Sequence, residues 1–212
     1  MTPDTLARVS DVLDGHGLRN SGSGGGGGVP SLASVLGAAS LSRACGVNVE
    51  LKYPTAEEIC LLGLRVPSRA AFVAAVLRVV AECGSRRIIY SSFDPDVAQI
   101  ARETAPATTP VLFLTEGDGG TNLADPRMRS FEAAIEWAST AALDGIVTHC
   151  AAVLRAPAAA VAAARERGLA LATYGRANND KAAAQVQRDA GVQMIILDDA
   201  RVARALALTL LH

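Results

Sequence analysis

The alternation of two kinds of segment is the feature that most constrains how this chain can fold. Short runs rich in β-branched residues predict strands at 47–53, 87–92, 111–115, 145–149, 169–174 and 194–197. Ala-rich stretches of helical periodicity predict helices at 3–13, 68–83, 95–104, 128–142, 157–167, 181–190 and 202–211. Such alternation builds a parallel sheet through right-handed crossovers, either as an open doubly wound sheet or as a barrel.

Length and composition set limits on the class of protein. The 212 residues suffice for one α/β domain with a sizeable core, and a hydrophobic fraction of 50% is typical of a folded chain. A net charge of -1 provides no field that attracts a polyanion, so we expect no nucleic-acid partner. Charges near the N-terminus and arginines within the apolar stretches argue against a secretion signal and a membrane span, which leaves the cytoplasm as the default location.

A glycine-rich segment divides the chain. Residues 21–28 read Ser-Gly-Ser-Gly-Gly-Gly-Gly-Gly, which predicts a flexible loop that separates a helix-like N-terminal segment within 1–28 from an α/β domain at 29–212. Residues 22–27 match Gly-x-Gly-x-x-Gly, but no strand precedes them, so glycine content alone explains the match. The cysteines show no zinc-ligand spacing and are interpreted as thiols in a reducing compartment: Cys45, Cys60, Cys83 and Cys150.

The strand at 47–53 carries two opposite charges on one face. Alternate side chains of a strand share a face, so Glu50 and Lys52 point the same way. Burying both would cost several kcal/mol per ion unless they are paired or hold charged ligands, such as a cation and an anion. The alternative is an edge strand on which both side chains simply face water.

Polar residues gather where the predicted strands end. In parallel α/β folds the carboxyl ends of the strands form the working face. The residues at or just beyond these ends are Glu50, Lys52, Ser92, Asp94, Thr115, Glu116, Thr148, His149, Tyr174, Asn178, Asn179, Asp198 and Asp199.

Several motifs, in order along the chain, resemble the glycerophosphodiester phosphodiesterase family, and most closely its eukaryotic glycerophosphocholine phosphodiesterases. The likeness runs from about Val29 to Asp199. The motifs are Val-Pro-Ser-Leu-Ala-Ser-Val-Leu (29–36), Val-Asn-Val-Glu-Leu-Lys-Tyr-Pro (47–54), Arg-Ile-Ile-Tyr-Ser-Ser-Phe-Asp-Pro-Asp-Val (87–97), Pro-Val-Leu-Phe-Leu-Thr-Glu-Gly (110–117), Gly-Ile-Val-Thr-His (145–149) and Thr-Tyr-Gly-Arg-Ala-Asn-Asn-Asp (173–180).

The resemblance implies a TIM-type (β/α) barrel that hydrolyses glycerophosphodiesters, such as glycerophosphocholine, to glycerol 3-phosphate and an alcohol. It also implies a divalent metal cation, Mg or Ca, with two histidines as acid and base. By this resemblance Glu50 is a metal ligand and Lys52 contacts the substrate phosphate. A hard cation prefers carboxylate oxygen, which agrees with the role given to Glu50.

Two aromatic residues match positions that line the family's substrate site. Phe93 belongs to the Ser-Phe pair after one strand, and Tyr174 stands where relatives often carry Trp near the leaving alcohol. An aromatic face there could hold a quaternary ammonium such as choline. Packing alone is the alternative, with Phe93 in the core and Tyr174 capping the barrel rim.

The departures from the family pattern are as informative as the matches. The family's His-Arg-Gly strand, its Glu-x-Asp strand and the following His-Asp belong upstream of Met1 and are not present, so no catalytic residue is assigned. His16 lies in a loop, His149 ends a strand and has at most a supporting role, and His212 has no assignable role. The chain thus predicts an incomplete barrel with six of eight strands, the first two missing, whose open edges favour self-association.

Three hypotheses follow for the function. The preferred one is the C-terminal part of a phosphodiesterase barrel, from a shortened enzyme, an incomplete gene sequence or a degenerate paralogue, with little or no hydrolysis of its own. The second is a non-catalytic module that binds a phosphodiester or phosphate through Lys52. The third is a complete enzyme with an open sheet, for which no Gly-x-Ser-x-Gly, His-Glu-x-x-His or Walker-type sequence is found.

Overall fold

The computed structural model describes residues 29–38, 46–84, 86–119, 125–199 and 201–204. These residues fall into two compact units, one within 1–47 and 54–88 and the other within 48–53 and 89–212. The predicted helix at 3–13, the glycine loop at 21–28 and most of the helix at 202–211 lie outside the described residues. The predicted boundary at residue 28 therefore stays a prediction.

The described part of the first unit is built mainly from three capped helices. They are α2 (Leu32–Gly37), α3 (Ala56–Leu62) and α4 (Arg69–Glu82), and α2 packs against α4. Thr55 and Glu58 form a reciprocal capping box at the start of α3, which satisfies two backbone N–H groups. Arg86 Nε donates to the Leu36 carbonyl at 2.8 Å, which ties the end of α2 to the chain beyond α4.

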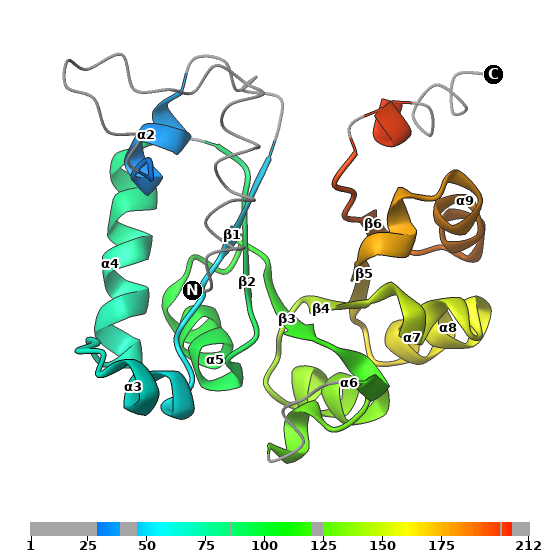
Figure 1. Ribbon diagram of the computed structural model, residues 1–212, viewed down its shortest axis with the longest axis horizontal. Helices are drawn as coiled ribbons and strands as arrows, with labels where there is room; N and C mark the ends of the chain where they lie inside the picture. Colours follow the sequence, from blue (N-terminus) through cyan, green and yellow to red (C-terminus); the bar gives the residue numbers. More distant parts are fainter. Residues whose placement is uncertain (1–28, 39–45, 85, 120–124, 200, 205–212) are drawn as a thin grey trace. The chain divides into compact units, whose positions relative to one another are not determined.

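The second unit contains most of a six-stranded sheet in which each strand pairs with the next along the chain (Figure 1). The strands are β1 (Val47–Glu50), β2 (Ile88–Ser92), β3 (Val111–Thr115), β4 (Gly145–His149), β5 (Ala170–Tyr174) and β6 (Met194–Ile195). The pairs from β2 to β6 are all parallel. A doubly wound sheet reverses its strand order at a switch point, whereas a barrel does not. The fold is therefore an incomplete (β/α) barrel, as predicted.

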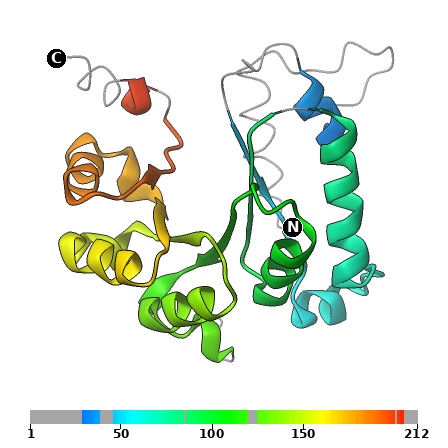
Figure 2. The same cartoon turned by 180° about the vertical axis from the view of Figure 1, so that it is seen from behind.

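Helices cover one face of this sheet (Figures 1 and 2). They are α5 (Pro95–Thr104), α6 (Phe131–Thr140), α7 (Cys150–Leu154), α8 (Pro157–Glu166) and α9 (Lys181–Ala190). Phe113 and Ile146 are fully buried on this face, and the Phe113 ring meets the Trp137 ring of α6 edge to face at 4.7 Å. The helical layer thus packs on every second residue of the strands.

The other face of the sheet carries a second apolar cluster. Leu112, Leu114, Val147 and Ala172 are buried there, and they contact the partly buried Phe93 and Tyr174. In a barrel this face points inward. The two predicted aromatic site residues therefore lie above the inner core, at the strand ends.

Most predicted elements are confirmed, and the differences are in the two edge strands, in three short helices and in the helix predicted at 128–142, which spans Phe131–Thr140. β3, β4, α5 and α9 have the predicted bounds. The strand predicted at 47–53 ends at Glu50, and the one at 194–197 ends at Ile195, because β1 and β6 each pair with only one neighbour. The short helices α2, α3 and α7 were not predicted, since five to seven residues are too few to show helical periodicity.

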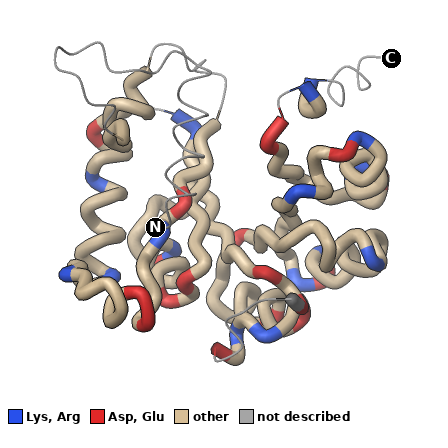
Figure 3. Tube along the Cα trace, in the orientation of Figure 1, with Lys and Arg blue, Asp and Glu red and all other residues tan. Residues whose placement is uncertain are grey.

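Charged residues of both signs are interspersed along the helices of each unit (Figure 3). In the second unit Arg127 bridges Asp96 and Asp125, with N–O distances of 2.6 and 2.7 Å, and lies over the Trp137 ring. Its guanidinium holds the pKa of Asp125 below its usual range. Among the described residues, no helix has both the length and the apolar character needed to cross a bilayer.

Asp144 locks the amino-terminal edge of the sheet, opposite the strand ends described above. Its carboxylate accepts the Val111 backbone N–H at 2.8 Å and Arg102 Nη1 at 2.7 Å. Arg102 also donates to the Thr109 carbonyl. The next residue, Gly145, lies so close to β5 that an added Cβ would come within 2.4 Å of the Ala170 carbonyl oxygen. This edge therefore fixes the register of β3, β4 and β5.

We expect Asp144→Ala to lower the free energy of unfolding by about 1–2 kcal/mol, because it removes a charged acceptor from a backbone N–H and from Arg102. Urea denaturation measures this change. Glu166→Ala, at an exposed position of α8, is the control and should change the free energy by less than about 0.5 kcal/mol. Equal effects of the two substitutions would contradict the locking role of Asp144.

Candidate functional site

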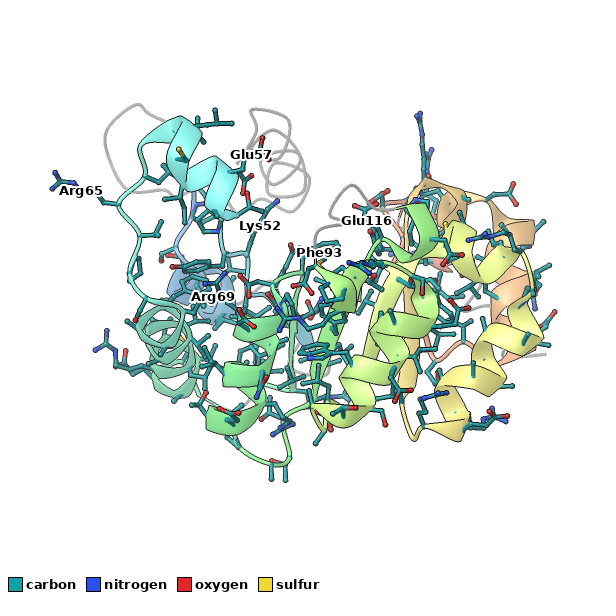
Figure 4. All side chains as sticks on the ribbon, turned by 90° about the horizontal axis from the view of Figure 1, so that it is seen from below. Lys52, Glu57, Arg65, Arg69, Phe93 and Glu116 are labelled. Atoms are coloured by element: carbon teal, nitrogen blue, oxygen red, sulfur yellow. The ribbon has the colours of Figure 1, made fainter. Side chains whose placement is uncertain are left out.

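The predicted site residues come from the carboxyl ends of three strands in the second unit. Glu50 is the last residue of β1 and Lys52 follows two positions later. Phe93 follows β2, and Tyr174 is the last residue of β5. Figure 4 looks onto this side and labels Lys52, Phe93 and Glu116 at the ends of β1, β2 and β3. The fold therefore brings all four predicted residues to one edge of the sheet.

Backbone pairing fixes the face on which Glu50 and Lys52 lie. The Leu51 N–H donates to the Ser91 carbonyl at 2.7 Å, which in a parallel ladder sets Glu50 level with Ser91 and Lys52 level with Phe93. Leu51 is buried, so its two neighbours point to the opposite, inner face.

Both charged side chains are exposed, and neither forms an ion pair with a described residue. They therefore do not incur the desolvation cost that full burial would impose. This exposure agrees with the alternative of an edge strand on which Glu50 and Lys52 face water. It also leaves both groups accessible to a ligand. The roles of Glu50 as a metal ligand and of Lys52 as a phosphate contact stay predictions.

Three rings form one group beside these charges. The Tyr174 ring meets the Phe93 ring edge to face at 5.9 Å and the His149 ring edge to face at 5.4 Å. Such geometry is the preferred one for aromatic pairs. The Tyr174 ring at the end of β5 thus contacts rings at the ends of β2 and β4, on the inner face of the sheet.

The Tyr174 hydroxyl is buried without a hydrogen bond of standard geometry to any described residue. Burial raises its pKa above the ordinary value, and the negative charges of Glu116 and Glu50 raise it further. A weak contact to Glu116 adds a smaller amount. Both carboxylates are therefore close enough to act on the same hydroxyl, which stays neutral at physiological pH.

Glu116 is the site residue that sequence reasoning did not single out. Thr115 is level with Thr148 and His149 is level with Tyr174, so Glu116 continues the same row across β3, β4 and β5. The sequence grouped Glu116 only with the polar residues at strand ends. The sequence feature that could have identified Glu116 is its period-two spacing from Leu112 and Leu114, which places it on the inner face.

Glu116, Gly117 and Asp118 form a Glu-x-Asp sequence, but the Asp118 side chain bonds to residues outside the candidate site. Its carboxylate pairs with Arg155 and accepts the Phe131 N–H at 3.1 Å. Gly117 between them has φ +68°, a left-handed conformation that turns the chain away from the strand direction. Glu116 and Asp118 therefore do not form a pair of ligands on one strand face.

His149 caps a helix. Its Nδ1 accepts the Ala151 N–H at 3.3 Å at the start of α7. Gly175 lies against this ring, since an added Cβ would come within 2.7 Å of Nε2. The structure thus gives His149 a helix-capping role, while His16 and His212 lie outside the described residues.

The two asparagines after β5 serve the fold. Asn178 is fully buried and its Nδ2 donates to the carbonyls of Thr173 and Ile196 at 3.2 and 3.0 Å. Asn179 Oδ1 accepts the Asp198 N–H at 2.8 Å. These contacts hold β5 and the segment after β6 together.

A divalent cation would find only part of a ligand set here. In the ranges that the structure describes, no group of three His, Cys, Asp or Glu side chains is arranged to hold a metal ion. Glu50 and Glu116 offer hard oxygen ligands from two different strands, whereas a calcium or magnesium site takes six or more oxygens. The described residues therefore fit a metal site only in part.

A family model described as "Glycerophosphoryl diester phosphodiesterase family" matches residues 5–202, nearly the whole chain. The chain belongs to this family. The matched range begins before Val29, where the motifs quoted above begin, so it also includes the glycine-rich segment.

Proteins with related sequences include fungal and plant phosphodiesterases. The chain is 34% identical to the glycerophosphocholine phosphodiesterase of Candida albicans over 75% of its own length and 14% of that protein. It is also 34% identical to a glycerophosphodiester phosphodiesterase of Arabidopsis thaliana, over 74% of its length and 40% of the plant protein. The chain therefore spans less than half of these relatives.

A solved structure confirms the fold. The glycerophosphodiester phosphodiesterase of Parabacteroides distasonis superposes with a TM-score of 0.55 at 15% sequence identity, covering 77% of this chain and 58% of that one. At this identity the likeness supports the barrel-type arrangement of strands and helices.

The environment of Tyr174 predicts a pH dependence. Its pKa is raised in the folded state, so this group's contribution to stability is full below about pH 10, the ordinary tyrosine value, and is lost as the pH rises further. We expect the free energy of unfolding to fall less steeply above pH 10 in Tyr174→Phe than in the wild type. Urea denaturation between pH 8 and 11 measures both slopes, and equal slopes would contradict the assignment.

Proposed function

We propose that this chain binds a glycerophosphodiester at the carboxyl edge of its sheet and contributes the lysine-bearing part of a phosphodiesterase site. The observation that carries the proposal is the pair Glu50 and Lys52, both exposed on the inner face and level with Ser91 and Phe93 of the next strand. Membership of the glycerophosphodiester phosphodiesterase family supports the proposal that the carboxyl edge binds a glycerophosphodiester.

Lys52 is the group we assign to the phosphate. Its ammonium is a compact cation on a flexible stem, and it forms no ion pair with a described residue. It can therefore donate to a phosphate oxygen without first giving up a partner. A charge-assisted hydrogen bond of this kind is about twice as strong as a neutral one.

Glu50 is the carboxylate that we assign to the divalent cation, Mg or Ca, which the family resemblance implies. When bound, such a cation would polarise the phosphoryl oxygens. Because the described residues provide only part of a ligand set, substrate oxygens and water would have to supply other positions.

Phe93 and Tyr174 border the place that we assign to the alcohol group of the substrate. Their rings meet edge to face above the inner apolar cluster, so they present a rigid apolar surface next to the charged pair. The neutral Tyr174 hydroxyl has no hydrogen bond of standard geometry and can donate to a ligand oxygen.

The chain alone should hydrolyse its ligand slowly or not at all. Acid and base groups each contribute about 10²–10⁴-fold to such reactions. The histidine at this edge, His149, is held by its Nδ1 in a helix cap, and the printed sequence contains no His-Arg-Gly segment. A non-catalytic module that binds phosphodiesters is the second candidate, favoured by an accessible Lys52 and by the lack of an acid–base histidine pair among the described residues.

Calorimetric titration of the 212-residue chain with glycerol 3-phosphate tests the binding part of the proposal. We expect Lys52→Ala to weaken binding about threefold to tenfold, because one charge-assisted contact is lost. Lys181→Ala, at an exposed position of α9, removes the same charge elsewhere and should leave binding unchanged. No binding by the wild type, or equal loss in both variants, would refute the assignment of Lys52.

Release of glycerol 3-phosphate from glycerophosphocholine, with added Mg²⁺ or Ca²⁺, tests the expectation of little hydrolysis. We expect binding without measurable turnover. Metal-dependent turnover that Glu50→Gln abolishes would show that the chain holds a complete active site.

A further inference from the structure

Three leucines at the end of α3 form an exposed apolar surface in the first unit. Among the described residues, five large apolar side chains are exposed, and three of them lie within 61–64. Leu61 is 74% exposed, Leu62 61% and Leu64 38%, and we call these three residues the leucine patch. Single exposed apolar residues are ordinary on a protein surface, whereas a contiguous group marks a contact surface.

The leucine patch has a fixed local structure although it adds little to the core. None of the α3 side chains is buried, and a helix of seven residues is not stable in water by itself. The capping box of Thr55 and Glu58 fixes its start. At its end Gly63 is left-handed, and the Leu64 N–H donates to the Ile59 carbonyl at 3.1 Å, which is the pattern of a Schellman motif. The two caps therefore present the leucines on a well-defined turn.

The charge next to the leucine patch is positive. Arg65 follows Leu64 directly, is exposed and forms no ion pair with a described residue. The acids of α3 lie in its first turn, where the Glu58 carboxylate accepts the Thr55 N–H, and Figure 4 shows Glu57 and Arg65 on opposite sides of the helix. A guanidinium beside apolar side chains matches the layers of a bilayer surface, in which phosphate groups lie above the acyl chains.

The size of the leucine patch favours a lipid surface over a protein partner. A stable protein interface buries about 800 Å² on each side and centres on a few large anchors in packed pockets. Three leucines and one arginine fall well short of that area. An anchor on a membrane surface needs less, because its affinity is the sum of the inserted apolar area and the attraction of basic residues to anionic lipid.

We propose that the leucine patch and Arg65 dock this chain reversibly on an anionic lipid surface. The leucines enter the boundary between headgroups and acyl chains, and the Arg65 guanidinium donates to lipid phosphate oxygens. Such docking needs no membrane-spanning helix. It is independent of the proposed function, because no residue of the candidate site takes part in it.

Cosedimentation of the 212-residue chain with lipid vesicles tests this inference. One set of vesicles is phosphatidylcholine alone, and the other contains phosphatidylcholine and phosphatidylserine at about 3:1. We expect the wild type to bind the anionic vesicles more tightly. The double substitution Leu61→Ser and Leu62→Ser should weaken this binding about tenfold or more, because the inserted apolar area is lost. Arg65→Gln should weaken it about fivefold and leave binding to phosphatidylcholine unchanged.

Matched substitutions on the second unit are the controls. Val186→Ser removes an exposed apolar side chain from α9, and Arg165→Gln removes an exposed guanidinium from α8. Both should bind the anionic vesicles as the wild type does. Added salt should weaken binding of the wild type toward that of Arg65→Gln, because it screens the attraction to anionic lipid.

Leu61→Trp keeps an apolar side chain at the leucine patch and adds a reporter of insertion. Its fluorescence should shift to the blue when anionic vesicles are added, relative to the wild type, in which Trp137 is packed against Phe113. Unchanged emission would show that the turn stays in water and would refute the proposal.

The remaining outcomes are equally decisive. No vesicle binding by the wild type, equal binding to both kinds of vesicle, or an equal loss in the control variants would overturn the proposal. Analytical ultracentrifugation tests the rival occupant, a second copy of the chain. A dimer that the double substitution of Leu61 and Leu62 abolishes would assign the leucine patch to self-association and contradict docking on lipid.

Discussion

The parallel pairing of the sheet is the constraint on which the rest of the structure depends. Each strand pairs with the next, and the register sets which residues stand level at the carboxyl edge. Because side chains alternate, a shift by one residue would turn Glu116 and Tyr174 toward the helical layer and expose apolar residues in their place. The site is therefore a consequence of register, which the opposite edge maintains through Asp144 and Gly145.

The two edges of the sheet differ in whether their charged side chains are paired. At the amino-terminal edge, charged side chains are paired and satisfy backbone groups, as Arg102 and Asp144 do. At the carboxyl edge Glu50, Lys52 and Glu116 are exposed and unpaired within the described residues. Charges without internal partners contribute little to folding, and these three side chains are accessible to a ligand.

Much of the fold could be predicted from the sequence because hydrophobic periodicity reports directly on local structure. β3 and β4 were predicted to the residue, since each is buried on both faces and reads as a short β-branched run. The ends of β1 and β6 were predicted too long because periodicity does not reveal which strand lacks a second neighbour. α3 depends on the Thr55–Glu58 cap rather than on a repeated apolar pattern.

The candidate site was predicted less completely than the fold. Strand alternation singled out Glu50 and Lys52, and family likeness added Phe93 and Tyr174. The sheet brings all four to one edge. Glu116 was missed as a site residue because it follows the last paired residue of β3, and only the register across β4 and β5 reveals its row. The capping bond of His149 depends on how β4 passes directly into α7, which no residue pattern shows.

The central claim is that ligands bind at the carboxyl edge of this sheet through residues of several strands. The most direct measurement is an NMR titration of the isotopically labelled chain with glycerophosphocholine, which reports each backbone amide separately. The account predicts that shifts concentrate at Lys52, Phe93, Glu116 and Tyr174, while amides at the opposite edge, such as Asp144 and Ala170, stay unchanged. Shifts centred on the opposite edge, or no shifts at all, would contradict it.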